Sequence, residues 1–334
     1  MHYLRAPLFF LDRKVFAVMS AFQPPLCPSA PDDSLDPQLE GVSAAILADD
    51  PRGEKFGVAL RRTFDMLLDG QHTGRFRWEQ LHKTEKTHAG TLVEINIQRA
   101  FNFGDGEKMD YSIEGIDVDC KYSQDIGKWM IPPEAMGHLC LGVWANDKAG
   151  IWSAGLFRVT EAVLTKKSNR DGKRSLTAAA RETAVRWLFR NEPLQDNILL
   201  RLSQDAIDAI FAPTYGTQRV HELFRRTQGC VVSRSVVATV AQQDDYMKRV
   251  RYNGGSRSAL RPEGIVILGQ YGNHQTVAEA LGLPVPGPGE SVSVRLTPWV
   301  PARADESWVE LEGRKWVVAR DGDPRVVAPM LPER

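Results

Sequence analysis

The sequence predicts two domains, a first one of α/β or α+β class and a second one of α+β class. Helical periodicity in the first half gives way to a tight β-hairpin and then to nearly continuous apolar strands. A second series of helices and strands follows a break near residue 191, and 334 residues suffice for two cores of ordinary size. We expect a disordered extension at 1–30, a first domain at 31–190 and a second domain at 195–334.

The composition of the chain limits which partners and which cellular location can be expected for it. Its 42 Lys and Arg balance 42 Asp and Glu, so attraction to a polyanion has to come from local patches. The four cysteines form no CxxC pair, which favours a reducing, cytoplasmic location. No apolar run is long enough to predict a membrane span. The first thirty residues contain many Pro and small residues, and Met19 is an alternative start to Met1.

The first predicted elements are helices. Apolar residues recur at helical spacing from 34 to 68, with an interruption at Pro51, and Asp69-Gly70 is a typical helix end. A basic, aromatic loop at 74–78 then precedes one or two further helices over 78–101. These helices lead into the hairpin.

The hairpin turns at Glu114-Gly115, because glycine tolerates the positive φ that a tight turn requires. Counting outward from this turn places Asp110 opposite Asp119, with Lys121 on the same charged face. Opposed carboxylates repel one another. A divalent cation between them would remove that cost, since hard cations such as Mg²⁺ favour carboxylate oxygens. The alternative is an ordinary solvated hairpin face.

This group of residue types suits phosphodiester hydrolysis. A metal held by carboxylates polarises the phosphoryl oxygen and lowers the pKa of a bound water. A nearby cation stabilises the charge that develops in the transition state. Asp110, Asp119 and Lys121 would supply these parts, and Glu94 would join them only if its helix packs near the hairpin. We therefore predict Mg²⁺-dependent cleavage by this face.

Strands complete the first domain. Apolar runs at 138–144 and 151–159 flank a turn at Asn146-Asp147 and are typical of strands buried on both faces. A closing helix is predicted at Ser175–Phe189. The domain boundary is expected near Asn191-Glu-Pro193, where this helix would break.

The second domain contains two short helices joined by a few residues that include Gly, a pattern that fits a helix-turn-helix. Ser233 is the expected N-cap of the second helix. The expected elements are helices at 203–211, 216–229 and 233–241, strands at 265–268 and 291–297, and a hairpin at 308–318 that turns at Glu312-Gly313.

The helix pair is also locally basic. From Tyr215 to Ile265 there are nine Lys or Arg and four Asp or Glu. In a helix-turn-helix the N-terminal residues of the second helix lie nearest the bases in the major groove. The alternative is a plain helical hairpin with a solvated basic face. The candidates for base edges are Ser233, Arg234 and Ser235, and those for phosphates are Arg219, Arg225, Arg226, Lys248, Arg249 and Arg251.

Beyond these patterns, the sequence resembles the NaeI-type restriction endonucleases over most of its length after residue 31. The motifs that carry the resemblance are Gly70-Gln-His-Thr-Gly74, Leu81-His-Lys-Thr-Glu-Lys-Thr-His88, Gly90-Thr-Leu-Val-Glu-Ile-Asn96, Val118-Asp-Cys-Lys121, Trp129-Met-Ile-Pro-Pro-Glu134, Glu222-Leu-Phe-Arg-Arg226, Ala238-Thr-Val-Ala-Gln-Gln-Asp-Asp245, Met247-Lys-Arg-Val-Arg251 and Leu260-Arg-Pro-Glu-Gly264.

The resemblance implies a homodimeric type IIE enzyme. Its first domain would be an α/β endonuclease domain of the PD-(D/E)xK type, and its second an α+β helix-turn-helix domain like that of the catabolite activator protein. The second domain would bind a second, activating copy of double-stranded DNA, and the cleaved palindrome would be GCCGGC. The family's active-site positions fall on Glu94, Asp110, Asp119 and Lys121. Two alternatives are a nicking repair nuclease of the mismatch-repair type and a DNA-binding regulator without cleavage activity.

Overall fold

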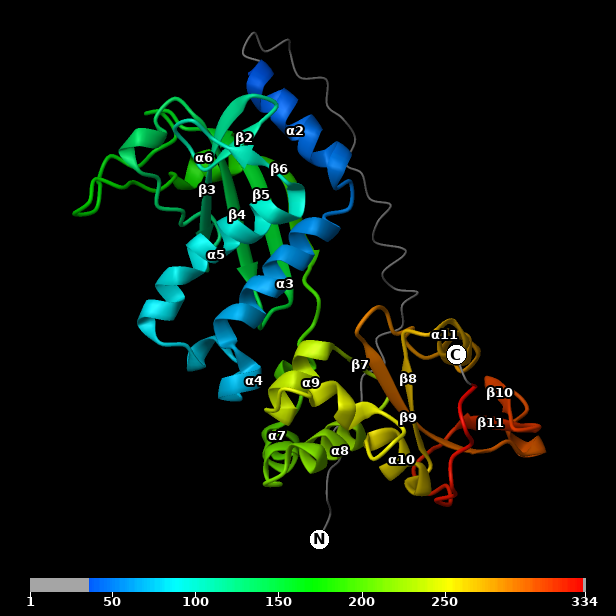
Figure 1. Cartoon of the computed structure of the whole chain (residues 1–334). Coiled ribbons are helices and arrows are strands. Elements are labelled where there is room, and N and C mark those ends of the chain that lie inside the picture. Colours follow the sequence, from blue (N-terminus) through cyan, green and yellow to red (C-terminus); the bar gives the residue numbers. More distant parts are fainter. Residues whose placement is uncertain (1–35, 333–334) are drawn as a thin grey trace.

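The computed structural model describes residues 36–332, so the extension expected at 1–30 lies outside the described residues. The described chain forms two halves, each built around its own β-sheet (Figure 1). The helices of the first half are α2 (Pro37–Asp49), α3 (Glu54–Leu68), α4 (Gly70–Thr73), α5 (Lys83–Phe101) and α6 (Ala178–Thr183). Its strands are β1 (Gly104–Asp105), β2 (Tyr111–Ile113), β3 (Ile116–Ser123), β4 (Leu139–Asn146), β5 (Ile151–Arg158) and β6 (Arg186–Pro193).

In the first sheet the spatial order of the six strands follows the chain, and only β3 and β4 run parallel. A parallel pair requires a crossover connection, and residues 124–138 provide it. Helices α3 and α5 cover one face, where Phe56, Ile97 and Leu141 share a core. The crossover covers the other face with Trp129, which lies directly over Gly142.

The hairpin prediction is confirmed at its turn. Ile113 pairs with Ile116, and the turn residues Glu114 and Gly115 have φ values of 51° and 73°. On β3, Val118 and Cys120 belong to the core under α3 and α5. Because successive side chains of a strand alternate between faces, Asp119 and Lys121 point to the opposite face, toward the crossover.

The closing helix predicted at Ser175–Phe189 is wrong over its second half. Helix α6 ends at Thr183, and β6 then pairs with β5 at the edge of the sheet. The alanines at the start of this stretch favour a helix, but the run from Val185 to Phe189 is rich in β-branched and aromatic residues that fit a strand. The helix break expected near Asn191 is therefore absent, because β6 continues to Pro193.

The second half packs helices against an antiparallel sheet whose central strand, β9, pairs with β7, β8 and β11. The expected helices, strands and terminal hairpin are all present, although α8 ends at Arg226 rather than at Gly229. The helices are α7 (Gln204–Phe211), α8 (Gly216–Arg226), α9 (Arg234–Ala241), α10 (Ser256–Ala259) and α11 (Gly272–Ala280). The strands are β7 (Val231–Val232), β8 (Ile265–Gly269), β9 (Ser291–Pro298), β10 (Trp308–Leu311) and β11 (Arg314–Val318).

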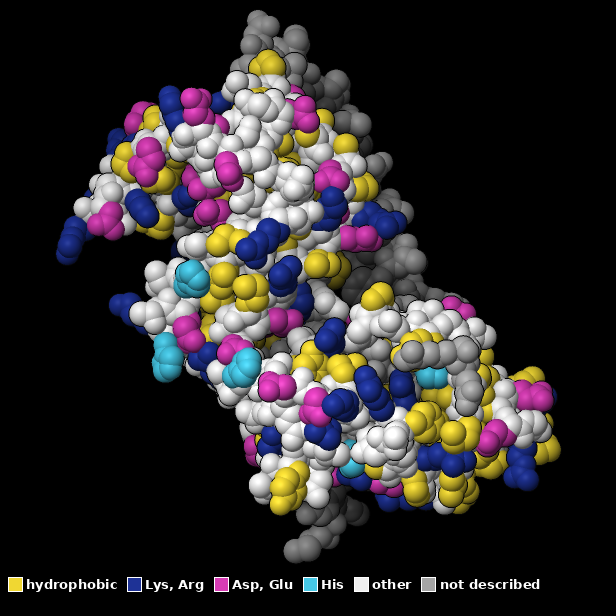
Figure 2. Space-filling model, in the orientation of Figure 1, with side chains coloured by type: hydrophobic (Ala, Val, Ile, Leu, Met, Phe, Trp, Pro, Cys, Tyr) yellow, Lys and Arg dark blue, Asp and Glu magenta, His cyan; other side chains and the backbone are white. Residues whose placement is uncertain are grey.

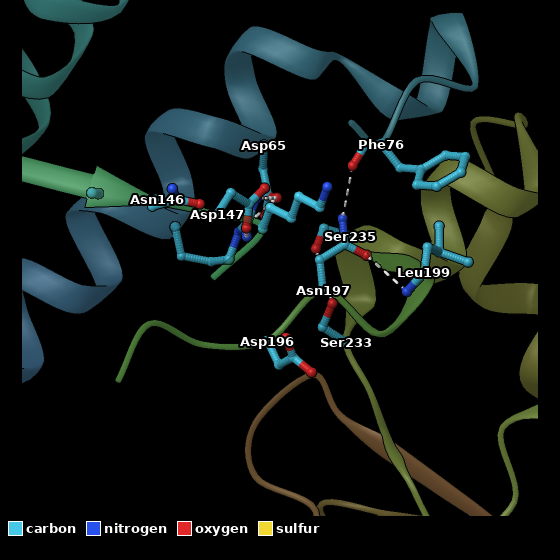
Figure 3. Close-up of polar contacts among 12 residues, drawn as sticks. Asp65, Phe76, Asn146, Asp147, Asp196, Asn197, Leu199, Ser233 and Ser235 are labelled. Carbon is cyan, nitrogen blue, oxygen red and sulfur yellow. Dashed lines mark hydrogen bonds and ion pairs between the residues drawn. The ribbon is translucent and has the colours of Figure 1, made fainter. Parts of the chain in front are cut away.

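A single aromatic residue of the first half is inserted into the core of the second. Phe76, in the loop after α4, is 4% exposed and stacks on Phe211 with ring centroids 5.9 Å apart. Its carbonyl accepts a 3.4 Å hydrogen bond from the side chain of Asn197, whose own Oδ1 accepts from the amide of Leu199 (Figure 3). The loop at 74–78 is therefore a structural joint between the two halves.

A buried ion pair lies close to this joint. Arg61 of α3 donates to both carboxylate oxygens of Asp147 in the β4–β5 turn, and also to Asp65. The side chains of Arg61 and Asp147 are 6% and 4% exposed. Asp65 lies close to Ser235 of α9, and both line the same hollow between the two halves. Figure 3 shows Asp65 and Asp147 close together, with Ser235 nearby. None of the helices between residues 36 and 332 is long and apolar enough to cross a membrane.

Candidate active site

Three of the predicted residues meet at the hairpin. Nζ of Lys121 lies 2.5 Å from Oδ1 of Asp119 and 3.4 Å from Oδ2 of Asp110. The same Asp110 oxygen accepts a 2.7 Å hydrogen bond from the amide of Cys120, which fixes the carboxylate just before β2 begins. One ammonium group thus bridges two carboxylates, one just before β2 and one on β3.

Burial strengthens the interactions within this group. Asp119 is 4% exposed, and burial raises its pKa to about 6, with Lys121 acting in the opposite direction and Asp110 adding to the rise. Burial by itself would lower the pKa of Lys121, but Asp119 and Asp110 raise it above its ordinary value. At neutral pH the group therefore holds an ionised Asp119 beside a protonated lysine.

Glu94 reaches the same neighbourhood from α5. The hydroxyl of Tyr111, at the start of β2, donates a 2.8 Å hydrogen bond to the carbonyl of Glu94 and so ties α5 to the hairpin. Burial raises the pKa of Glu94, and the negative charge of Asp110 raises it further while Lys121 lowers it. The condition set on Glu94, that its helix packs near the hairpin, is met.

One contact inside this group was not predicted from the sequence. Cys140 on β4 pairs in register with Asp119 on β3, and its fully buried thiol donates to Oδ2 of Asp119 at 3.7 Å. Burial raises the pKa of this thiol well above its usual range, so Cys140 stays neutral and acts as a donor. The only signal in the sequence was its place in a buried strand, because the register of a parallel pair cannot be counted from a turn.

The acids suit a hard cation, although they do not form a closed cage. Among residues 36–332 there is no group of three or more His, Cys, Asp or Glu side chains arranged to hold a metal ion. Asp110 and Asp119 nevertheless share one cationic partner, and each interaction with Lys121 uses only one oxygen of the carboxylate. Two carboxylates that already require a positive charge between them, with Glu94 alongside, form an oxygen donor set that fits Mg²⁺.

The basic residues predicted to contact DNA differ in their partners within the protein. Arg219 donates to four backbone carbonyls, including those of Val240 and Ala241 at the end of α9, so it ties α8 to α9. Arg225 is paired with Glu263 and Glu222. The structure thus engages Arg219 and Arg225 in internal contacts rather than leaving them facing outward. Arg226 also pairs with Glu222, and both Lys248 and Arg249 pair with Asp245.

Helix α9 has the expected N-cap, and beyond its first residues the helix is buried. Ser233 accepts from the amide of Val236, while every residue from Val236 to Ala241 is buried. One face of α9 packs on α8, and α4 of the first half covers another. The approach is close, because a Cβ on Gly70 would lie 2.0 Å from Oγ1 of Thr239. In this arrangement of the two halves, α9 is therefore covered beyond its first residues, and only its N-terminal end is left at the surface.

Basic residues at the start of α9 do remain at the surface. Arg234 is exposed and donates to the hydroxyl of Tyr246 at 2.7 Å. It lines a hollow of about 700 Å³, and an adjoining groove of about 950 Å³ is lined by Arg251 and Arg257. Lys and Arg side chains gather over this region in Figure 2. A basic, hollowed surface therefore runs past the N-terminus of α9.

Comparison with known proteins gives the family. The family model described as restriction endonuclease NaeI matches residues 40–327. A type II restriction enzyme, NaeI of Lentzea aerocolonigenes, is 49% identical over 320 residues, which cover 93% of this chain and 98% of that enzyme. The sequence resemblance is thus confirmed. The chain belongs to the NaeI family of type II restriction endonucleases, which are site-specific deoxyribonucleases acting on double-stranded DNA.

Proposed function

We propose that this enzyme cleaves DNA by a Mg²⁺-dependent hydrolysis at the hairpin, with Asp110, Asp119 and Glu94 as the metal-holding acids. The observation that carries the proposal is the bridging position of Lys121 between Asp119 and Asp110. This fits a PD-(D/E)xK nuclease, in which an acid precedes an acid-x-Lys strand. The first half would be the endonuclease domain, at about 31–190.

Each residue has a distinct task in this scheme. Mg²⁺ bound at the acids would polarise a phosphoryl oxygen and lower the pKa of a coordinated water. Lys121 is protonated and buried in part, so its positive charge would stabilise a phosphate oxygen whose negative charge increases in the transition state. The Cys120 amide and the Cys140 thiol each hold one oxygen of the acids and keep the carboxylates oriented.

A pair of isosteric variants on one strand tests the site. Asp119→Asn should reduce the cleavage rate at least about a hundredfold while leaving DNA binding in place. Asp117→Asn is the matched control, because Asp117 is on the same strand but its carboxylate accepts from the amides of Glu107 and Lys108 and not from Lys121. Cleavage of plasmid DNA by both variants is measured under single-turnover conditions. Wild-type cleavage by Asp119→Asn would remove Asp119 from the mechanism.

The metal requirement is tested separately from activity. Titration calorimetry with Mg²⁺ on the DNA-free protein should show binding that weakens in Asp119→Asn and persists in Asp117→Asn. Equal binding by the two variants would contradict the assignment of Asp119 as a ligand.

We also propose that the enzyme is a homodimer of type IIE, in which a second duplex binds to the second half and activates cleavage. The supporting observation is the basic surface at the N-terminus of α9, where Ser233, Arg234 and Ser235 lie beside Arg251 and Arg257. The helix pair α8–α9 would be its helix-turn-helix. The palindrome GCCGGC, implied by the resemblance, is the first sequence to test.

The second site has a simple kinetic signature. A plasmid with one cognate site should be cut faster when a short cognate duplex is added in trans, and Arg234→Gln together with Arg251→Gln should weaken that stimulation. Sedimentation of the DNA-free protein tests the homodimer. An absence of stimulation by the duplex would exclude an activating site. Membership in a restriction enzyme family already argues against a regulator without cleavage activity.

A further inference from the structure

Residues 164–176 form a basic finger that projects from the first half. Its two sides are held by a bridge between Leu164 and Leu176 and by a 2.8 Å hydrogen bond from the amide of Thr165 to the carbonyl of Ser175. At the tip, Oδ1 of Asn169 accepts from the amides of Asp171 and Lys173. In Figure 1 the finger is the green loop that reaches farthest to the left. The finger is thus a formed hairpin-like element with a defined tip.

The finger is strongly basic. Between residues 164 and 174 there are five Lys or Arg and one Asp, in a chain with zero formal net charge. Arg174 at the base pairs with Glu161 through two 2.8 Å contacts. Within residues 36–332 the other four cations, Lys166, Lys167, Arg170 and Lys173, form no ion pair. Three of these four, all except the half-buried Lys173, are exposed.

The base of the finger lies on the same face of the first sheet as the candidate active site. Leu164 and Leu176 pack in the hydrophobic cluster that contains Cys140 and Met109. Cys140 contacts Asp119, and Met109 immediately precedes Asp110 in the chain. The base of the finger is therefore anchored to the residues that back the candidate active site, on the face of the sheet opposite α3 and α5. Figure 2 shows a hollow in the outline of the molecule between this projection and the lobe formed by α4 and the start of α5.

We propose that the basic finger binds the phosphate backbone of the substrate duplex beside the cleavage site. The longer side of the finger, residues 164–168, reaches roughly 17 Å if it is extended, and double-stranded DNA carries one negative charge about every 1.7 Å of its axis. Three of the four side chains are lysines, which act as point charges and are suited to phosphates rather than to bidentate reading of a base. The contact would position the duplex without contributing to sequence choice.

This inference rests on the proposed cleavage site, because it assumes that the duplex lies along the face of the first sheet that carries Asp119. The two claims fail separately. The site is judged by cleavage in the Asp119→Asn variant, and the finger by the salt dependence of binding in a protein whose acids are intact.

The test compares a neutral finger with a charge-preserving one. The neutral variant carries Lys166→Gln, Lys167→Gln, Arg170→Gln and Lys173→Gln, and the control exchanges Lys for Arg and Arg for Lys at the same four positions. Three of the four side chains are exposed and the half-buried Lys173 forms no ion pair with the described residues, so both variants should keep a melting temperature close to that of wild type. Binding of a cognate duplex is measured by fluorescence anisotropy from 50 to 300 mM salt, without divalent cation to prevent cleavage.

Each lost phosphate contact should reduce the slope of log K against log salt by about 0.9. We therefore expect the slope of the neutral variant to fall by as much as about 3.6, and the control to match wild type. The difference should shrink on a duplex cut short at the recognition site, because the finger then has no flanking phosphates. A neutral variant with the wild-type slope would overturn the proposal, as would a changed oligomeric state with no change in slope.

Discussion

Replacing Phe76 by Ala should weaken the joint between the two halves. The ring is 4% exposed, stacks on Phe211 and belongs to the core that α7, α8 and α9 form. A buried Phe→Ala change costs about 3–5 kcal/mol through lost transfer free energy and the cavity that remains, and the stacked ring pair contributes about 0.5–1.5 kcal/mol beyond its buried area. We expect a loss in the upper part of that range, because the contact with Phe211 is lost together with the buried area of the ring.

The assay is amide hydrogen exchange of the full chain, followed by mass spectrometry. In Phe76→Ala, protection should fall in α4, in α9 and in the segment around Asn197, while β3 to β5 keep theirs. Phe56→Ala is the matched control, since Phe56 is fully buried in the first core and makes no contact across the joint. It should reduce protection of α3 and the first sheet instead. If Phe76→Ala leaves α4 and α9 as protected as in wild type, the joint is held by other contacts and the reasoning is wrong.

Three further changes test individual contacts. Arg61→Met should lower the urea midpoint more than Asp147→Asn does. Without Arg61, both Asp65 and Asp147 lose their cationic partner, whereas in Asp147→Asn the arginine keeps its pair with Asp65. Breaking a buried ion pair costs about 3–5 kcal/mol. Arg75 lowers the pKa of Glu85 to about 2, so this carboxylate stabilises the fold above its unfolded pKa and the stabilisation is lost as pH falls toward 2. Glu85→Gln should therefore melt below wild type at pH 7, and the two melting temperatures should converge near pH 2. Tyr111→Phe removes the hydroxyl that holds α5 and should lower the cleavage rate and raise the Mg²⁺ concentration needed for half activity, with little change in duplex affinity.

The sequence was most informative where geometry is local. The hairpin turn follows from a Glu-Gly pair, and counting from it brought Asp110, Asp119 and Lys121 together, as the structure confirms. The prediction of Ser233 as the N-cap of α9 is confirmed as well. Such features depend on a few neighbouring residues, so one chain is enough to predict them. The catalytic roles of these residues remain predictions.

Features that depend on distant partners were missed. The second half of the stretch at Ser175–Phe189 becomes a strand because β5 offers it an edge, and local propensity does not record that edge. The contact of Cys140 with Asp119 depends on the register of a parallel pair whose crossover is long. The burial of α9 depends on α4, more than 160 residues away in the chain. In each case the deciding partner lies outside any local window.

The cover that α4 places over α9 has a thermodynamic consequence. A duplex that needs the buried face of α9 can bind only those molecules in which Gly70 has moved away from Thr239. Its apparent dissociation constant is then the intrinsic one divided by the fraction of such molecules, so a minor open population of one in a hundred weakens binding about a hundredfold. By the same linkage, a duplex bound there holds the two halves apart. The binding free energy that the duplex loses equals the free energy that α4 and α9 gain by packing together.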